Sequence, residues 1–292
     1  MITLYIIGNG FDLYHGLPTS YGKFYAFAKN DLKELEEAFC LEVDEIDPWG
    51  DFENKLGEYD WELVYDDHND LDVMDNSFRP SMAFGLEDEL IELTDNLVSR
   101  IDEQFHCWID SIDVKCADKK LNLEPNGAYL SFNYTPTLQW VYGISDKHIN
   151  HIHGSVSGKE KLIYGHTVIM DENPELDENG ESNRTIFTDA ENAAKYPFHA
   201  FRKPVEQIIE NNDQWFSALK GRIGRVVVIG HSLNGIDLPY FKRINDVVAG
   251  VPWIVTYHKE EERKRHMLIL RSIGFDMGGV IQCQPDDLPI LL

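Results

Sequence analysis

Four short polar or glycine-containing turns carry the side chains that are able to do chemistry in this chain. They are Gly8-Asn9-Gly10, Asn133, His153-Gly154 and Gly230-His231-Ser232. A neutral amide such as Asn133 can position a water molecule or a hydroxyl group without titrating, and an imidazole such as His153 can take a proton near neutral pH. Each turn directly follows an apolar run, so the four turns would meet at one edge of a parallel sheet.

The elements that must hold these turns are short apolar strands. Leu4–Ile7 is too short for a helix, and Arg225–Ile229 is the clearest buried strand in the chain. Strands alternate with helical patterns, which indicates an α/β fold with a parallel, Rossmann-like sheet. We expect further strands at Ala128–Phe132, Ile149–Ile152, Lys161–Tyr164, Trp253–Tyr257 and Val280–Cys283, and helices at Tyr21–Phe39, Leu86–Ile112, Lys203–Leu219 and Glu260–Ile273.

The segment between the first and second expected strands is mostly helical. Its clearest helix, Leu86–Ile112, has apolar residues three, four or seven apart that form one stripe. Residues 41–82 are acidic and aromatic with poor periodicity, so short helices and loops around a local cluster are expected there. We therefore predict a single α/β domain, 1–292, with a mostly helical insertion at 22–124.

Composition limits the classes of partner. The formal net charge of −25 argues against nucleic acid, because phosphate backbones are bound by Lys and Arg. Residues 42–75 carry fourteen Asp or Glu against the single Lys55, which is typical of a solvated acidic surface. No apolar run approaches membrane-spanning length, and the four cysteines form no C-x-x-C pair. Reduced thiols in the cytoplasm fit this pattern.

The first glycine turn allows two interpretations. Gly8 and Gly10 let the backbone approach a phosphate-bearing ligand where a Cβ would clash. The dinucleotide fingerprint G-x-G-x-x-G is not met, however, because Leu13 occupies the third glycine position. A purely structural tight turn is the alternative.

The polar residues also have structural alternatives. Asn133 could cap the helix expected from Pro136, and Asp12 could form the turn rather than contact a ligand. His151 and His153 share one face of a strand, so either could be a packing residue. The pair could bind a metal, but no third ligand is evident, and we expect no metal.

A competing enzyme class is suggested by Gly230-His231-Ser232-Leu233-Asn234. This segment follows a strand and nearly matches the nucleophile elbow G-x-S-x-G, with Ser232 as the nucleophile of an α/β-hydrolase. The side chain of Asn234 would crowd that turn. Asp237 is too close in sequence to serve as the acid of the triad.

Taken together, the turns resemble those of the sirtuin-type NAD-binding fold. Gly8-Asn9-Gly10, followed by Gly16-Leu17-Pro18, has the spacing G-x-G-x5-G-[IL]-P. Phe132-Asn133-Tyr134 and His153-Gly154-Ser155 resemble the catalytic Asn and His-Gly turns, and Gly230–Leu233 resembles the ribose-binding G-x-S-L turn. The variant GNGFDLxxGLPTSY, with SFNYT and HIHGS, is similar to the AbiH family of phage abortive-infection proteins within the SIR2-like group.

The resemblance implies an NAD-hydrolysing antiphage effector. No cysteine lies between Cys116 and Cys283, so the zinc module of a sirtuin deacylase is missing. The implied catalytic residues are Asn133 and His153. The residues implied to bind NAD, with backbone N–H groups at Gly8–Phe11 holding the diphosphate, are Gly8, Asn9, Gly10, Phe11, Asp12, Pro18, Thr19, Gly230, His231, Ser232 and Leu233.

A function of a different class stays open. The chain could bind NAD or a related nucleotide as a sensor or partner module without turnover. A phage-derived trigger, a partner protein and assembly into a homo-oligomer are compatible with either function.

Overall fold

The computed structural model describes residues 1–32, 51–158, 161–172 and 174–288. The chain divides into two compact units. We call Met1–Lys23, Trp108–Ile163 and Pro204–Leu292 the sheet unit, and Phe24–Cys107 with Tyr164–Lys203 the helical unit. The expected insertion at 22–124 overlaps the first segment of the helical unit. That these residues form an insertion within a single domain stays a prediction.

The sheet unit contains one six-stranded sheet in the order β3-β2-β1-β4-β5-β6, and all its strand pairs are parallel. This confirms the expected α/β fold with a parallel, Rossmann-like sheet, and the order is that of doubly wound dinucleotide-binding folds. The strands are β1 (Ile2–Ile7), β2 (Ala128–Ser131), β3 (Ile149–His151), β4 (Ile223–Ile229), β5 (Trp253–Thr256) and β6 (Val280–Cys283).

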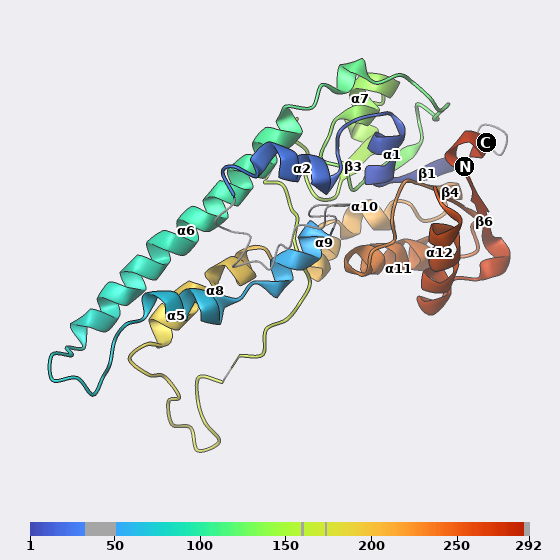
Figure 1. Cartoon of the computed structure of the whole chain (residues 1–292). Helices are drawn as coiled ribbons and strands as arrows, with labels where there is room; N and C mark the ends of the chain where they lie inside the picture. The colour runs from blue at the N-terminus through green and yellow to red at the C-terminus, as the bar shows by residue number, and fades with distance from the viewer. Residues whose placement is uncertain (33–50, 159–160, 173, 289–292) are drawn as a thin grey trace. The chain divides into compact units, whose positions relative to one another are not determined.

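Both faces of the sheet are buried, which is why its strands are apolar throughout. On one face, Leu4 and Val226 belong to a core that includes residues of α9, α10, α11 and α12. On the other face, Tyr5 and Val227 pack with residues of α1 and α7. Figure 1 shows α7 and α11 on opposite sides of the strands. These helices are α1 (Asn9–Tyr14), α7 (Thr137–Tyr142), α9 (Val205–Asn211), α10 (Asp213–Ser217), α11 (Leu238–Val247) and α12 (Glu260–Ser272).

Two expected elements of the sheet unit are wrong in detail. Lys161–Tyr164 is not a strand: the Ile163 N–H donates to the His153 carbonyl (2.9 Å), and the segment adds no strand to the sheet. The helix expected at Lys203–Leu219 is interrupted at Asn212. The Asn212 side chain donates to the Ile208 carbonyl (2.8 Å), a local bond that competes with the helical backbone.

The helical unit is built around aromatic side chains. Phe24, Phe52, Phe105 and Tyr164 form a chain of ring contacts, with Phe105 and Tyr164 stacked at 4.3 Å. Lys203, which is buried, forms an ion pair with Glu53 (2.7 Å). The unit draws on α2 (Tyr21–Ala28), α4 (Phe52–Lys55), α5 (Trp61–His68), α6 (Ser81–Asp110) and α8 (Thr188–Ala200).

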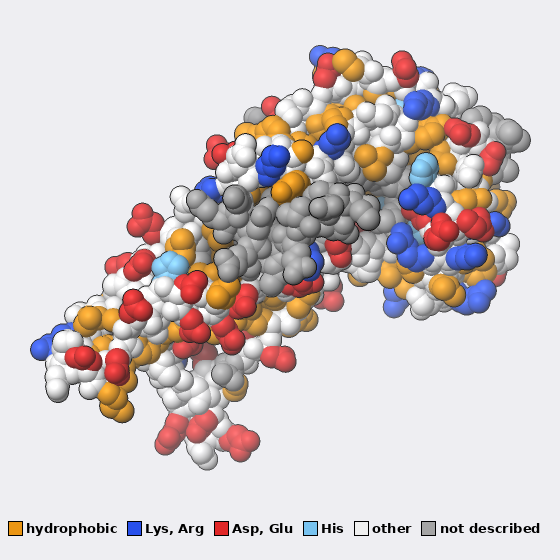
Figure 2. All heavy atoms as spheres, viewed as in Figure 1, with side chains coloured by type: hydrophobic (Ala, Val, Ile, Leu, Met, Phe, Trp, Pro, Cys, Tyr) orange, Lys and Arg blue, Asp and Glu red, His pale blue; other side chains and the backbone are white. Residues whose placement is uncertain are grey.

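The helix expected at Leu86–Ile112 is confirmed as α6, whereas α8 was not expected. Of the helix expected at Tyr21–Phe39, residues 33–39 lie outside the described residues. Asp and Glu side chains are spread over the helical unit in Figure 2.

Short 3-10 turns occur in both units. They are η1 (Leu56–Glu58), η2 (Val114–Cys116), η3 (Asp146–His148), η4 (Gly235–Asp237), η5 (Met277–Gly279) and η6 (Pro285–Asp287).

Candidate functional site

The strand register brings the four predicted turns to one edge of the sheet. Ile7 at the end of β1 pairs with Ile229 of β4 and with Ser131 of β2, and Ser131 pairs with His151 of β3. The strand order reverses between β1 and β4, and in doubly wound sheets ligands bind in the crevice at this point. Parallel pairing therefore gathers the turns as predicted.

The turns after β1 and β4 pack backbone against backbone. Gly10 N–H donates to Gly230 O (2.7 Å), and a Cβ on Gly10 would lie 2.8 Å from Gly230 Cα. Gly230 has φ +65°, and a Cβ there would lie 2.1 Å from Phe11 N. A Cβ on Gly8 would lie 2.6 Å from His231 Cα. This contact between turns requires the three glycines irrespective of any ligand.

The packing of these two turns occupies most of the N–H groups that were expected to hold a phosphate. Gly8 N–H donates to Ile229 O (3.0 Å) and Phe11 N–H donates to Gly8 O (2.9 Å), so these donors and that of Gly10 are used within the protein. The N–H of Asn9, the first residue of α1, has no acceptor within the helix. The Asn9 side chain donates to Thr19 O (2.8 Å) and fixes the segment containing Pro18 beside the turn.

Asp12 is the centre of a buried polar cluster. Its Oδ2 accepts a hydrogen bond from the Thr135 hydroxyl (2.5 Å), which also lies 3.0 Å from the Thr137 hydroxyl. Burial raises the pKa of Asp12 from 3.8 to about 6, although Thr135, Thr137 and Asn133 lower it. The Asn133 carboxamide is close enough to Asp12 to help lower this pKa, although neither of its polar atoms meets full hydrogen-bond geometry.

Asn133 is held by its backbone while its carboxamide lacks partners. Its N–H donates to Ser131 Oγ (3.2 Å), and its carbonyl accepts from His151 Nδ1 (3.0 Å). Pro136 is the N-cap of α7, so Asn133 does not cap that helix. Its side-chain nitrogen and oxygen and the Asp12 Oδ1 atom are buried without hydrogen-bond partners. Buried polar groups are otherwise nearly always paired, so this cluster can receive a ligand or water.

His151 is a supporting residue. Because Asn133 O can only accept, His151 Nδ1 carries the proton, and its Nε2 faces the Gln139 amide (3.0 Å). Burial lowers the pKa of His151. Both ring nitrogens of His151 therefore have partners within the protein.

His153 is almost fully buried at the end of β3, with 2% of its surface exposed. Its Nε2 lies 3.3 Å from the Tyr240 hydroxyl and 3.9 Å from Asp237 Oδ1. Its ring packs edge-on against Phe132, with centroids 5.2 Å apart. The strand end and the aromatic contacts thus fix the position of the imidazole.

The turn after β4 does not form the catalytic centre of an α/β-hydrolase. Within the described part of the chain, the hydroxyl of the exposed Ser232 makes no hydrogen bond to a histidine. His231 instead faces Asp237 Oδ2 (3.5 Å), and Leu233 has φ +54°. Sequence reasoning set Asp237 aside and missed Tyr240, Thr135 and Thr137, although both threonines lie within four residues of Asn133.

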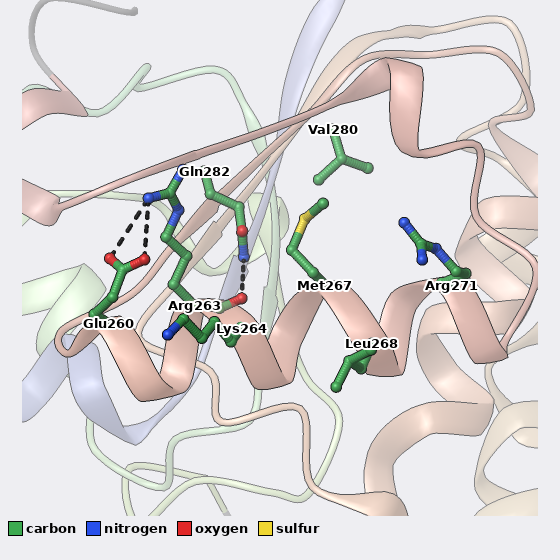
Figure 3. A pocket seen from close by; sticks show the side chains of 8 residues that line it. All are labelled: Glu260, Arg263, Lys264, Met267, Leu268, Arg271, Val280 and Gln282. Carbon is green, nitrogen blue, oxygen red and sulfur yellow. Dashed lines mark hydrogen bonds and ion pairs between the residues drawn. The ribbon is translucent and has the colours of Figure 1, made fainter.

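A separate groove of about 530 Å³ lies between α12 and the edge strand β6. Figure 3 shows Arg263 with Glu260 at one end and Arg271 at the other, with Met267 and Val280 between them. Lys and Arg side chains gather with acidic ones around α12 (Figure 2). The groove contains none of the predicted site residues.

The chain is thus a doubly wound α/β protein with buried amide, carboxyl and imidazole groups at the carboxyl edge of its sheet. The family model described as bacteriophage abortive infection AbiH matches residues 4–257, and the chain belongs to this family. Membership indicates a role in abortive infection, a defence against bacteriophage. No curated protein and no solved structure matches the chain. Over the described ranges, no helix has the length and apolarity needed to cross a bilayer.

Proposed function

We propose that this AbiH-family protein hydrolyses NAD⁺ at the nicotinamide–ribose bond and so acts as an antiphage effector. The observation that carries the proposal is the buried Asn133 carboxamide, unpartnered beside the unpartnered Oδ1 of Asp12. Both lie at the edge where doubly wound sheets bind nucleotides. The resemblance of the four turns to those of the sirtuin-type fold suggests NAD⁺ as the substrate.

In the proposed reaction, the oxygen of a water molecule bonds to ribose C1′. The bond from C1′ to the pyridinium nitrogen breaks, and its electron pair returns to the ring. Neutral nicotinamide leaves, and the proton lost by the water passes to His153 as general base. The products are nicotinamide, ADP-ribose and a proton.

Each residue of the cluster has a part in this proposal. The Asn133 carboxamide orients the water or a ribose hydroxyl, since it offers both a donor and an acceptor. Asp12 accepts from a ribose hydroxyl through its Oδ1. The Asn9 N–H and the buried, unpartnered Thr19 hydroxyl bind the diphosphate in place of the full set of N–H groups expected at Gly8–Phe11.

The test is nicotinamide release from NAD⁺ by purified protein, followed by liquid chromatography. Asn133→Ala and His153→Ala are compared with Asn96→Ala and His106→Ala, which alter exposed residues of α6. Loss of a general base lowers turnover by about 10²- to 10⁴-fold, and the control variants keep full activity. Calorimetric NAD⁺ binding separates loss of chemistry from loss of binding.

A nucleotide-binding module without turnover is the second candidate. It is favoured by the burial of His153, of which only 2% is exposed. Cellular NAD⁺ is therefore also measured in cells that produce the protein during phage infection. NAD⁺ binding with no consumption, either by purified protein or during infection, would reject hydrolysis in favour of the module.

A further inference from the structure

The carboxylate of Asp237 lies between two buried imidazoles. Its Oδ2 is 3.5 Å from His231 Nε2, and its Oδ1 is 3.9 Å from His153 Nε2. Asp237 stands at the N-cap position of α11, yet its side chain makes no capping hydrogen bond. Helix capping therefore does not explain why the Asp237 side chain is oriented toward the two imidazoles.

The protonation state of His231 follows from its other ring nitrogen. The backbone N–H of Leu233 donates to His231 Nδ1 (2.9 Å), and a backbone N–H can only donate. Nδ1 is therefore unprotonated, and the neutral ring carries its proton on Nε2, which faces Asp237. This hydrogen bond therefore fixes the tautomer of the neutral His231 ring.

Backbone strain accompanies this arrangement. Leu233 is the one residue other than glycine with a positive φ in the described part of the chain. For a residue with a Cβ, this conformation costs about 1–2 kcal/mol. Such strain persists only where the surroundings enforce it, and it concentrates at functional sites. Here it places the Leu233 N–H on His231 Nδ1.

We propose that Asp237 and His231 are positioning residues that together set the proton on the His153 imidazole. His231 donates its Nε2 proton toward Asp237 and favours the ionised carboxylate. The carboxylate favours the Nε2–H form of the neutral His153 ring. The role of His153 as a base rests on the proposed NAD⁺ hydrolysis, whereas the arrangement of the three side chains does not.

Other charged and titratable groups face this cluster. Tyr240 of α11 reaches His153 Nε2. From α12, the buried His266 lies close enough to His231 for the two to interact electrostatically, and Glu262 lies 3.7 Å from His266 Nε2. Asp237→Asn leaves all of these groups unchanged, so its effect on His153 isolates the carboxylate of Asp237.

The experiment is nitrogen NMR of the full chain labelled at histidine, titrated from about pH 5.5 to 8.5. Signals of the two rings are assigned by their loss in His153→Gln and His231→Gln. We expect the Nε2–H form for both neutral rings. Asp237→Asn lowers the pKa of His153 by about 1 unit or more, as loss of a nearby opposite charge does. Asp246→Asn, an exposed change on α11, leaves it unchanged.

An Nδ1–H form of His231, or a His153 pKa that is equal in the wild type and Asp237→Asn, overturns the proposal. If Asp237→Asn does not fold, the forms of the two rings in the wild type decide the question alone. In the release assay, Asp237→Asn lowers kcat about tenfold or more with little change in KM, and moves the acidic limb of the kcat profile to lower pH. A wild type without nicotinamide release counts against NAD⁺ hydrolysis, while the NMR result still decides the role of Asp237.

Discussion

Replacing Asp12 with Asn is expected to change how the stability of the protein depends on pH. Burial raises the pKa of this carboxyl from 3.8 to about 6 in the folded protein. The folded state therefore binds the proton more tightly than the unfolded state does. As pH rises between these two pKa values, the unfolded chain releases the Asp12 proton, while the folded protein, in which water cannot solvate the ion, still holds it. The folded protein therefore loses stability through Asp12.

The magnitude follows from the two pKa values. Their difference corresponds to about 3 kcal/mol of unfolding free energy when Asp12 is fully ionised. About half of this, roughly 1.5 kcal/mol, is lost between pH 5 and 8. The amide introduced by Asp12→Asn does not titrate, and its carbonyl can still accept from Thr135. The variant therefore gains roughly 1.5 kcal/mol relative to the wild type when the pH is raised from 5 to 8.

The assay is urea unfolding at both pH values, followed by tryptophan fluorescence. The other carboxyl groups contribute equally to both proteins, so the difference between variant and wild type isolates Asp12. Asp95→Asn, an exposed change on α6, serves as the matched control and shows no such dependence. A difference between Asp12→Asn and wild type that is the same at pH 5 and pH 8 would refute the reasoning.

The remaining predictions concern packing and charge. Gly230→Ala is expected to destabilise the protein by several kcal/mol in urea unfolding, because the added Cβ would lie 2.1 Å from Phe11 N. The control Gly250→Ala has a similar φ of +78° but no atom within 4 Å of the added Cβ, so it costs only about 1–2 kcal/mol. Lys203→Met leaves Glu53 without its buried partner and costs about 3–5 kcal/mol, and adding Glu53→Gln recovers most of that loss; no recovery would contradict the ion-pair explanation. Thr135→Val removes a hydrogen bond that lowers the pKa of Asp12. Carbon NMR of the Asp12 carboxyl should therefore show a pKa above that of the wild type. An equal or lower pKa would count against the contact between Thr135 and Asp12.

The sheet and its turns could be predicted because each strand is an apolar run that ends at a glycine or polar residue. Parallel pairing then follows from the alternation of strands and helices, and it brings Asn133 and His153 to one edge. Helix α8 was missed because it is polar and contains Pro197, so its helical pattern is weak. The break at Asn212 depends on a side-chain bond that no apolar periodicity records.

The site could be predicted only as far as local motifs extend. Asp237 was set aside because it lies too close to Ser232 for a hydrolase triad, and its contact with His153 arises only when β3 and β4 join the same sheet. The N–H groups of Gly8 and Gly10 were expected to face a phosphate. Their use in backbone contacts depends on the approach of the Gly230 turn, which no local spacing reveals.

The position of β1 between β2 and β4 also sets when the candidate site can form during synthesis. Thr3 of β1 bonds to Glu124 and Arg225, which lie 121 and 222 residues further along the chain. At ribosomal rates of about 5–20 residues per second, β1 waits roughly 10–40 s for its second neighbour. The glycine contact and Asp237 come later still. A nascent or prematurely terminated chain that ends before Asp237 therefore lacks the assembled site.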